Sequence, residues 1–360
     1  METLKILHNL QFAGKNILIY KCLYFTTFYA IFKRTSEPLN IKRQPAKVIA
    51  VARKESCTHM NEIQKKIISL KKERGALILS HYYQALPVQD ISDAVGDSFA
   101  LAKLAQKAEQ DIIILCGVRF MAESAKILNP GKTVYLPFEA AGCPMADMIC
   151  PDDVLSLRRK YPKAAVVCYV NSSAAVKAVS DICCTSSSAE AIVRSLPNRQ
   201  IIFVPDRNLG AYVAKKVPEK EIILFEGYCP IHNGVSPEDA VAAKKASPEA
   251  CLLVHPECRP DVLAHADYIG STAGILDYAR NTDAKEMIIG TEIGVYDILK
   301  RELPEKKFLM VKDEFVCPDM KKTELEDVLA CLEGKRSPIE LPENEMLGAK
   351  ASLERMVSIG

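Results

Sequence analysis

Short apolar runs alternate with helical patterns along residues 60–360. The runs are four to six residues long and fall into three sets: ALILSHYY, DIIILCGV and TVYLPFEAAGCP; AVVCYVNSS, QIIFVPDR and EIILFEGYCP; CLLVHPE, EMIIGTE and KKFLMVKDEFVCP. Helical patterns such as FALAKLAQKA and GVYDILKREL fill the gaps. Apolar strands that alternate with helices are typical of α/β units with parallel sheets. Each set therefore predicts one unit in the order strand, helices, strand, helix, strand.

Three features recur at matched positions in these units. Each unit ends in a Cys-Pro pair, and the cysteines, Cys143, Cys229 and Cys317, lie 86 and 88 residues apart. Each unit also has a polar residue at the end of its first strand and a hydroxyl residue 17 positions later: His81 and Ser98, Tyr169 and Ser186, His255 and Thr272. Such a recurrence marks an internal repeat. We therefore predict homologous domains at 60–145, 146–232 and 233–320, followed by a C-terminal helical segment at 321–360.

The repeat also predicts where the cysteines meet. In open parallel α/β sheets, functional groups gather beyond the carboxyl ends of the strands. We expect an α/β fold of three homologous three-layer sandwich domains around a pseudo-threefold axis, with the active site at their junction. Each domain would supply one thiol, so that only the complete set of three forms the site.

Three thiols from three repeats favour a metal centre with one open position. Structural zinc sites usually close with four ligands from tight Cys-x-x-Cys pairs, and none of these three cysteines belongs to such a pair. Iron–sulfur clusters are also held by thiolates, and an iron without a protein ligand can act as a Lewis acid in dehydration. The alternative for a free cysteine is a small buried packing residue. We expect this of Cys116, Cys150, Cys168, Cys183, Cys184, Cys251, Cys258 and Cys331.

The cysteine content indicates the cellular location, and the net charge bears on nucleic-acid binding. The chain of 360 residues has 13 cysteines, an odd number in what reads as a large α/β protein. Thiols in such chains are more often buried, catalytic or metal-binding than disulfide-bonded, which predicts a reducing, cytoplasmic location. The net charge is +2, so nothing overall indicates nucleic-acid binding.

Residues 1–59 differ from the rest of the chain. They carry a net charge of +7 and the apolar stretch ILIYKCLYFTTFYAIFKR, whereas residues 60–360 carry −5. Three interpretations are open: a dispensable extension or mis-assigned start, a targeting presequence, or a membrane anchor. An anchor needs about 20 apolar residues, and this run is shorter and is broken by Lys21. We favour a dispensable extension without membrane association, because Met60 opens an amphipathic helix that leads into a strand.

Polar residues at helix starts and strand ends are candidates for substrate binding and catalysis. Hydroxyls before predicted helices suit phosphates and carboxylates, with plain capping as the alternative; they are Ser98, Ser186, Ser271 and Thr272. SSAE at 187–190 is predicted to form a capping box. Side chains at strand ends suit general acid–base catalysis, with a buried structural histidine as the alternative. The candidates are His81, Tyr83, Tyr169, Asn171, His255 and Glu257, and His232 is a weaker one.

The ordered set of motifs resembles the quinolinate synthase family. SHYYQ, GDS, GVRFMAESAKIL, AGCPMAD, YVNSSAAVKA, TSS, PDRNLG, VHPE, GST and CPDM carry the resemblance from about Met60 to the C-terminus. The resemblance implies an oxygen-sensitive 4Fe-4S cluster. It implies condensation of iminoaspartate with dihydroxyacetone phosphate to quinolinate, phosphate and water in de novo NAD biosynthesis. It also implies functional coupling to the enzyme that produces iminoaspartate.

By resemblance, the functional positions of the family fall on residues of this chain. The cluster ligands fall on Cys143, Cys229 and Cys317. Tyr83 and Glu257 are the expected proton-transfer groups, with His81 and His255 as further catalytic residues. The substrate-binding positions fall on His81, Ser98, Tyr169, Asn171, Ser186, His255, Glu257, Ser271 and Thr272. Some relatives carry Cys-x-x-Cys-x-x-Cys-Pro at the last ligand, but KDEFVCP does not, so we expect no thiol switch there.

Two other classes of function compete with this one. A non-catalytic iron–sulfur or zinc sensor on the same scaffold would need a closed fourth ligand, and the sequence offers no obvious one. Another cluster-dependent hydro-lyase would act on a different small carboxylate. The residues alone do not separate that enzyme from a quinolinate synthase.

Overall fold

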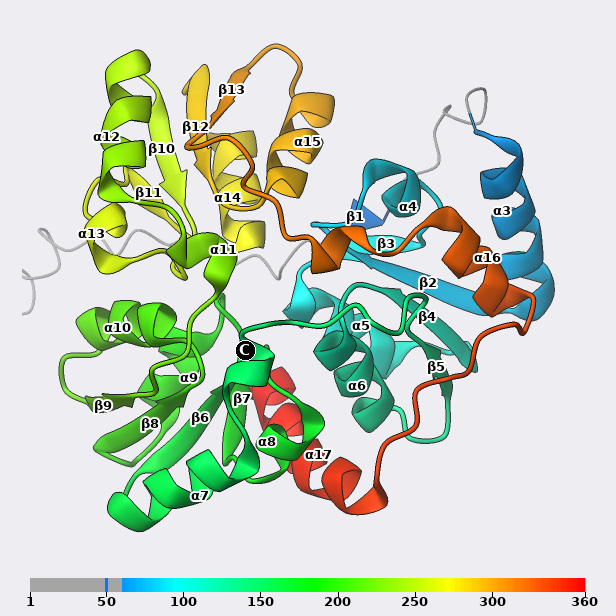
Figure 1. Ribbon diagram of the computed structural model, residues 1–360, viewed down its shortest axis with the longest axis horizontal. Helices are drawn as coiled ribbons and strands as arrows, with labels where there is room; N and C mark the ends of the chain where they lie inside the picture. Colours follow the sequence, from blue (N-terminus) through cyan, green and yellow to red (C-terminus); the bar gives the residue numbers. More distant parts are fainter. Residues whose placement is uncertain (1–48, 51–59, 360) are drawn as a thin grey trace, which may run out of the picture. The chain divides into compact units, whose positions relative to one another are not determined.

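The computed structural model describes residues 49–50 and 60–359, which lie in one compact unit, Ala46–Gly360. Three sheets share one strand order, and each forms its own lobe in Figure 1. The first contains β3 (Ala94–Gly96), β2 (Ala76–His81), β4 (Ile112–Cys116) and β5 (Thr133–Tyr135). The second contains β7 (Ile182–Cys184), β6 (Ala165–Tyr169), β8 (Gln200–Val204) and β9 (Glu221–Leu224). The third contains β11 (Tyr268–Ile269), β10 (Cys251–Val254), β12 (Glu286–Gly290) and β13 (Lys307–Met310).

All neighbouring strands in these three sets are parallel, and β1 (Ile49–Ala50) adds an antiparallel edge beside β3. The predicted fold class of three similar α/β domains is therefore confirmed. The nine apolar runs form the expected strands, but the sequence missed a fourth strand in each sheet. These strands have only two or three residues. Each follows an aspartate whose carboxylate accepts the backbone N–H of a residue in the neighbouring strand: Asp93 from Ile78, Asp181 from Val166, and Asp267 from Leu252.

Helices connect the strands within each domain. The first domain has α3 (Glu62–Arg74), α4 (Leu86–Asp90), α5 (Ser98–Lys107) and α6 (Arg119–Leu128). The second has α7 (Pro151–Lys160), α8 (Ala174–Ala178), α9 (Ala189–Ser195) and α10 (Arg207–Lys216). The third has α12 (Pro237–Ala246), α13 (Pro260–Leu263), α14 (Thr272–Asn281) and α15 (Ile293–Glu302).

One helix start differs from its prediction. The capping box predicted in SSAE is absent, since the side chain of Ser188, the residue before α9, accepts no hydrogen bond from the helix. Its hydroxyl instead accepts the Thr185 N–H. The hydroxyl therefore orders the turn that precedes the helix.

The C-terminal segment folds back over the first two domains. Helix α16 (Leu325–Leu332) packs on α3, and α17 (Glu343–Ile359) packs on α8, β7 and α6, as the orange and red ribbons of Figure 1 show. The Ser352 hydroxyl of α17 donates to the Lys177 carbonyl oxygen. The segment is helical as predicted, whereas the exact domain boundaries stay a prediction.

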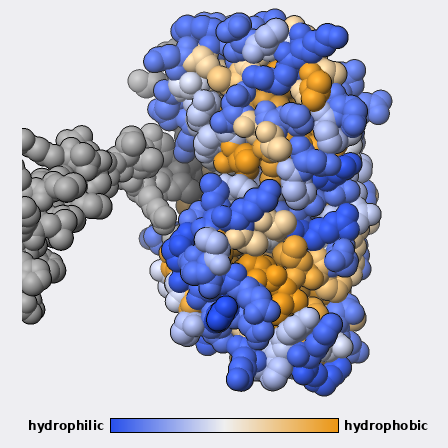
Figure 2. Space-filling view, turned by 90° about the vertical axis from the view of Figure 1, so that its left-hand side faces the viewer, coloured by the Kyte–Doolittle hydropathy of each residue, from blue (hydrophilic) through white to orange (hydrophobic). Residues whose placement is uncertain are grey.

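The surface of the described residues is largely polar. Figure 2 shows a mostly hydrophilic face with hydrophobic patches between charged side chains. Apolar side chains concentrate in the interior, where the buried residues of all three sheets form continuous clusters. Within 49–50 and 60–359, no helix is both long enough and apolar enough to span a membrane. Apart from residues 49–50, the N-terminal segment on which the extension, presequence and anchor interpretations rest lies outside the described residues.

Candidate active site

A cavity of about 120 Å³ lies where the strand ends of the three domains meet. It is lined by twelve of the thirteen predicted site residues: His81, Tyr83, Ser98, Cys143, Tyr169, Asn171, Ser186, Cys229, His255, Glu257, Thr272 and Cys317. The exception is Ser271, which is not among the lining residues and whose hydroxyl accepts the Gly274 N–H as the cap of α14. The repeat thus brings twelve of its thirteen residues together, and Ser271 caps the neighbouring helix, so its role in substrate binding stays a prediction.

Each Cys-Pro pair opens a short helical turn. The turns are η2 (Ala146–Met148), α11 (Pro230–Asn233) and η3 (Asp319–Lys321). Proline suits such a start because its ring fixes φ and the missing N–H is not needed there. The next backbone N–H groups are then free to point back at the sulfur: Met145 and Ala146 at Cys143, His232 at Cys229, and Asp319 and Met320 at Cys317. The motif therefore builds the same thiol-facing turn three times.

The three thiols share one site and fit a metal centre. Each is partly buried, and Cys143 interacts electrostatically with both of the others. Burial raises the pKa of Cys143 to about 12, that of Cys317 to about 11, and that of Cys229 well above its usual range. Unaided, these groups stay protonated at neutral pH, whereas a bound metal deprotonates its thiol ligands. No fourth cysteine lines the cavity within the described part of the chain, so the residues fit a cluster held by three thiolates.

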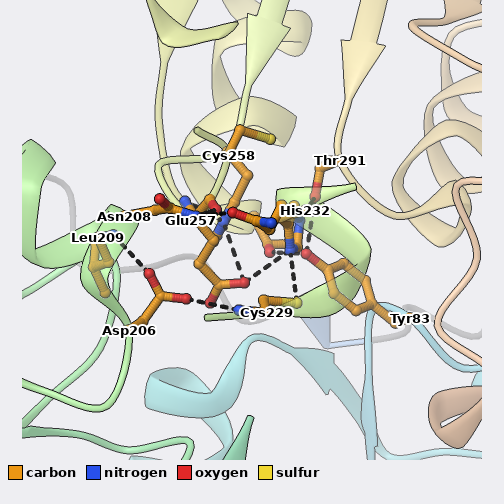
Figure 3. Close-up of polar contacts among 12 residues, drawn as sticks. Tyr83, Asp206, Asn208, Leu209, Cys229, His232, Glu257, Cys258 and Thr291 are labelled. Carbon is orange, nitrogen blue, oxygen red and sulfur yellow. Dashed lines mark hydrogen bonds and ion pairs between the residues drawn. The ribbon is translucent and has the colours of Figure 1, made fainter. Parts of the chain in front are cut away.

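Glu257 is the centre of the hydrogen-bond network drawn in Figure 3. Tyr169 Oη donates to its Oε1 at 2.5 Å, and His232 Nδ1 lies 2.8 Å from its Oε2. Burial alone would raise the pKa of Glu257, but His232, His255 and the hydrogen bonds outweigh burial and hold that pKa at about 2. The carboxylate is therefore ionised at neutral pH and able to accept a proton.

Tyr83 occupies the other end of this network. Its hydroxyl lies 2.9 Å from both Thr272 Oγ1 and Thr291 Oγ1, and Thr291 Oγ1 lies 3.0 Å from His232 Nε2. Burial, followed by the charge of Glu257, raises the pKa of Tyr83 well above its usual range. Tyr83 is thus a protonated hydroxyl that a continuous hydrogen-bonded chain connects to an ionised carboxylate.

The histidines at the first strand ends are buried and neutral. Burial lowers the pKa of His81 and of His255 to about 3 in each case. His81 Nδ1 accepts the Tyr83 N–H at 3.1 Å, and the His255 ring stacks on His232 with centroids 4.6 Å apart. Both imidazoles therefore serve at neutral pH as hydrogen-bonding groups without charge.

The rest of the lining combines apolar side chains with hydroxyl and amide groups, and its described residues include no cationic side chain. Ser98, Ser186 and Thr272 bring hydroxyls to the cavity, and Asn171 Oδ1 is buried without a hydrogen-bond partner in the described structure. An unpaired buried carbonyl is costly and is typical of a place where a ligand donates a hydrogen bond. No lysine or arginine is among the described lining residues. An anionic substrate would therefore be held by hydroxyls, backbone N–H groups and a metal.

Sequence reasoning underrated or missed several residues of the site. His232 ranked as a weak candidate, yet it contacts Cys229 Sγ at 3.3 Å as well as Glu257 and Thr291. Asp206, Thr291 and Glu292 were not considered, although each follows the end of β8 or β12. The signal was present in VPDR and GTE, since these stretches end apolar runs just as VHPE does.

Most of the remaining described cysteines are packing residues, as predicted. Cys116, Cys168, Cys183, Cys184, Cys258 and Cys331 are buried, and Cys251 is partly buried. The prediction is wrong for Cys150, which is exposed and precedes α7. Its position before a Pro-initiated helix places it at the surface, because capping residues usually stay in contact with water.

Three α/β domains that complete one buried, ionisable site only where they meet define a multidomain α/β enzyme. Residues 65–358 match a family model described as Quinolinate synthetase A protein. A quinolinate synthase from Caldicellulosiruptor saccharolyticus is 51% identical over 300 residues, covering 83% of this chain and 99% of that protein. Quinolinate synthases from Clostridium kluyveri and Thermodesulfovibrio yellowstonii are each 48% identical, covering 83% of this chain and 98% and 99% of theirs. The chain belongs to the quinolinate synthetase A family, whose members are enzymes of NAD biosynthesis.

Proposed function

We propose that this enzyme condenses iminoaspartate with dihydroxyacetone phosphate to quinolinate, phosphate and water, using a 4Fe-4S cluster bound by Cys143, Cys229 and Cys317. The observation that carries the proposal is the meeting of three thiols, one from each domain, beside Glu257 and Tyr83. A cluster with three protein thiolates supplies one iron as a Lewis acid. Family membership makes quinolinate the expected product.

The side chains of the cavity supply the groups that such a condensation needs. Glu257 is ionised and accepts a proton, and the Tyr83 hydroxyl is protonated and donates one. Proton transfer by positioned groups typically contributes about 10²–10⁴-fold to a rate. Releasing phosphate and water from the condensing carbon skeleton requires both kinds of group in the same cavity.

Binding falls to the neutral polar residues. The hydroxyls of Ser98, Ser186 and Thr272 hold the phosphate and carboxylates, and Asn171 Oδ1 accepts an N–H or O–H from substrate. His81, Tyr169 and His255 complete the substrate contacts as uncharged hydrogen-bonding groups. Ser271 stabilises this part of the cavity by capping α14, the helix that begins at Thr272.

Anaerobic purification followed by iron and sulfide analysis and a quinolinate assay tests the proposal. We expect about four irons and four sulfides per chain, and quinolinate only when dihydroxyacetone phosphate and freshly generated iminoaspartate are both present. Adding the enzyme that produces iminoaspartate should sustain turnover if the two activities are coupled. Iron-loaded protein that binds neither substrate, or that dehydrates another carboxylate instead, would overturn the proposal.

A metal sensor remains the second candidate because one observation favours it. Cys229, His232 and Glu257 offer ligand atoms that lie within 4.8 Å of one another, a spacing that could close around a single metal ion. A sensor of this kind would retain one zinc or iron per chain without sulfide and would form no quinolinate. The same metal and sulfide analysis therefore separates the two functions.

A further inference from the structure

The three cysteine turns rest on three equivalent helix starts. Val118, Asp206 and Glu292 precede α6, α10 and α15. The next residue in each case donates its N–H across to the segment before the cysteine: Arg119 to Ala141 O, Arg207 to Gly227 O and Ile293 to Phe315 O, each at 2.8 Å. The backbone thus ties every cysteine turn to a helix start in the same way. The side chains at these starts differ.

In the second and third domains a buried carboxylate adds a second tie. Asp206 Oδ1 accepts the Leu209 N–H at 2.7 Å, and Oδ2 accepts the Cys229 N–H at 3.0 Å, as Figure 3 shows. Glu292 Oε2 accepts the Gly294 N–H at 2.7 Å, and Oε1 accepts the Cys317 N–H at 3.2 Å. Both side chains are 0% exposed. Each carboxylate therefore bridges a helix start and the backbone of a thiol-bearing residue.

The first domain lacks this device. Val118 stands at the equivalent position and makes no side-chain cap. The turn of Cys143 is held from across the junction instead, because Gly142 donates its N–H to Asp319 Oδ1 at 3.2 Å. Asp319 itself lies two residues after Cys317. The anchoring of the first thiol thus depends on the turn that carries the third.

Capping alone does not explain the two carboxylates. A neutral asparagine or serine caps a helix about as well, but only a carboxylate offers two acceptor oxygens for the two N–H groups, because the second terminal atom of an amide side chain is a donor. Hydrogen-bonded groups behind metal ligands orient those ligands and tune the metal. Lys321 Nζ lies 2.9 Å from Glu292 Oε1, so the charge of Glu292 is partly balanced. No ion pair to Asp206 is found among the described residues, and burial, followed by the charge of Glu257, raises its pKa well above the usual range, so its part is to accept the two backbone N–H groups.

We propose that Asp206 and Glu292 are positioning residues that fix Cys229 and Cys317 for the metal centre by holding the backbone N–H of each cysteine. The inference rests on the cluster of the proposed function. Asp206 lies outside the cavity lining and Glu292 belongs to it, and both act through the backbone of a cysteine.

The test uses the holoenzyme and paired variants. Asp206→Ala and Glu292→Ala remove both acceptor oxygens, whereas Asp206→Asn and Glu292→Gln keep one acceptor oxygen and lose the other. Asp181→Ala and Asp181→Asn are the matched controls, because Asp181 also accepts a backbone N–H, that of Val166, but at the start of the parallel strands, whereas Cys229 follows the end of β9. Anaerobic iron release to a chelator and the visible absorption spectrum of the cluster are measured for each, with circular dichroism as a check of folding.

We expect the alanine variants to release iron about 10–100-fold faster than wild type. The amide variants keep one of the two ties and should release iron at a rate between those of wild type and the alanine variants, with a cluster spectrum closer to wild type than that of the alanine variants. The Asp181 variants should match wild type in both measurements. If an alanine variant does not fold, the amide variant decides the outcome.

Three results would overturn the inference. Equal acceleration of iron release in Asp206→Ala and Asp181→Ala would mean a general loss of stability. An unchanged iron release rate in the alanine variants would remove the positioning role. A wild-type protein with no iron and sulfide would overturn the proposed function together with this inference, and is recognised before any variant is made.

Discussion

The joint between the first and second domains is built differently from the joints that the third domain makes with both. In the first joint, the fully buried Lys177 ammonium donates to Phe120 O, Ser124 Oγ and Ser172 O, at 3.3, 3.1 and 2.7 Å. Glu123 Oε2 accepts the Ala174 N–H across the same boundary at 2.9 Å. Helix α17 packs beside this joint on α6 and α8. Of the residues in this contact, only Phe120 lines the cavity.

The third domain meets the others through the groups proposed for catalysis. Glu257 accepts from Tyr169 of the second domain, and Tyr83 of the first domain bonds to Thr272 and Thr291 of the third. The contacts that assemble these joints are therefore also the contacts that set the pKa values of the site. We therefore expect a substitution at the first joint to lower the free energy of unfolding alone. A substitution at the joints of the third domain should first lower the catalytic rate.

Replacing one of the three cavity thiols should have the largest effect on iron content and activity. We expect Cys143→Ser, Cys229→Ser and Cys317→Ser each to abolish the visible absorbance of the cluster and all quinolinate formation, because every domain supplies only one ligand. The measurements are iron content, the absorption spectrum and the quinolinate assay.

Cys258→Ser and Cys331→Ser are the matched controls, since both thiols are buried away from the cavity lining. These two variants should keep iron and most of their activity. A protein that retains its cluster without Cys317 but loses it without Cys258 would show that the repeat selected the wrong third ligand.

Removing a proton-transfer group should leave the cluster and slow turnover. We expect Glu257→Gln and Tyr83→Phe to lower kcat by about 10²–10⁴-fold at unchanged iron content. The phenol hydroxyl bridges Thr272 and Thr291 at 2.9 Å, so its loss also interrupts the chain to His232. Near-normal turnover of Tyr83→Phe would make Tyr83 a packing residue of the joint.

The sequence predicts those site residues that stand at matched positions in all three repeats. Cys143, Cys229 and Cys317 stand at matched positions with the same neighbour, and the cavity contains all three. The positions of Asp206 and Glu292 escaped notice because the first repeat has Val118 there, so recurrence gave no signal. Their role appears only once the fold brings each carboxylate to the N–H of a cysteine more than twenty residues away.

The fold was predictable wherever hydrophobic patterning is strong. Nine apolar runs gave nine strands, whereas β3, β7 and β11 are too short to show a period and depend on pairing with a neighbouring strand. The polar joint at Lys177 could not be predicted from the sequence either, since an isolated lysine in a helical pattern usually lies at the surface. Burial there follows from the packing of α17, which lies some 170 residues further along the chain.

Breaking the structural joint should lower stability and leave the chemistry intact. Lys177→Met keeps the length of the side chain but leaves the Phe120 and Ser172 carbonyls without their donor, which should cost about 1–3 kcal/mol of unfolding free energy. Urea denaturation of the anaerobic protein measures this loss. Lys65→Met, on the exposed face of α3, is the control and should change stability by less than about 1 kcal/mol. A large fall in kcat per bound cluster for Lys177→Met would contradict the division between the two kinds of joint.

Removing residues 1–59 should have the smallest effect, because the segment contributes to neither joint within the described structure. All thirteen predicted site residues follow Met60, and the family match begins at residue 65. The one described contact of the segment is the pairing of β1 with β3, two residues at the edge of the first sheet. A chain that starts at Met60 should fold, bind the same amount of iron and form quinolinate at the rate of the full chain. Thermal melts, iron content and turnover of the two proteins, purified side by side, measure this. Insoluble protein would show that the edge strand is needed for the first domain, and a soluble protein that has lost activity would mean that the segment reaches the cavity.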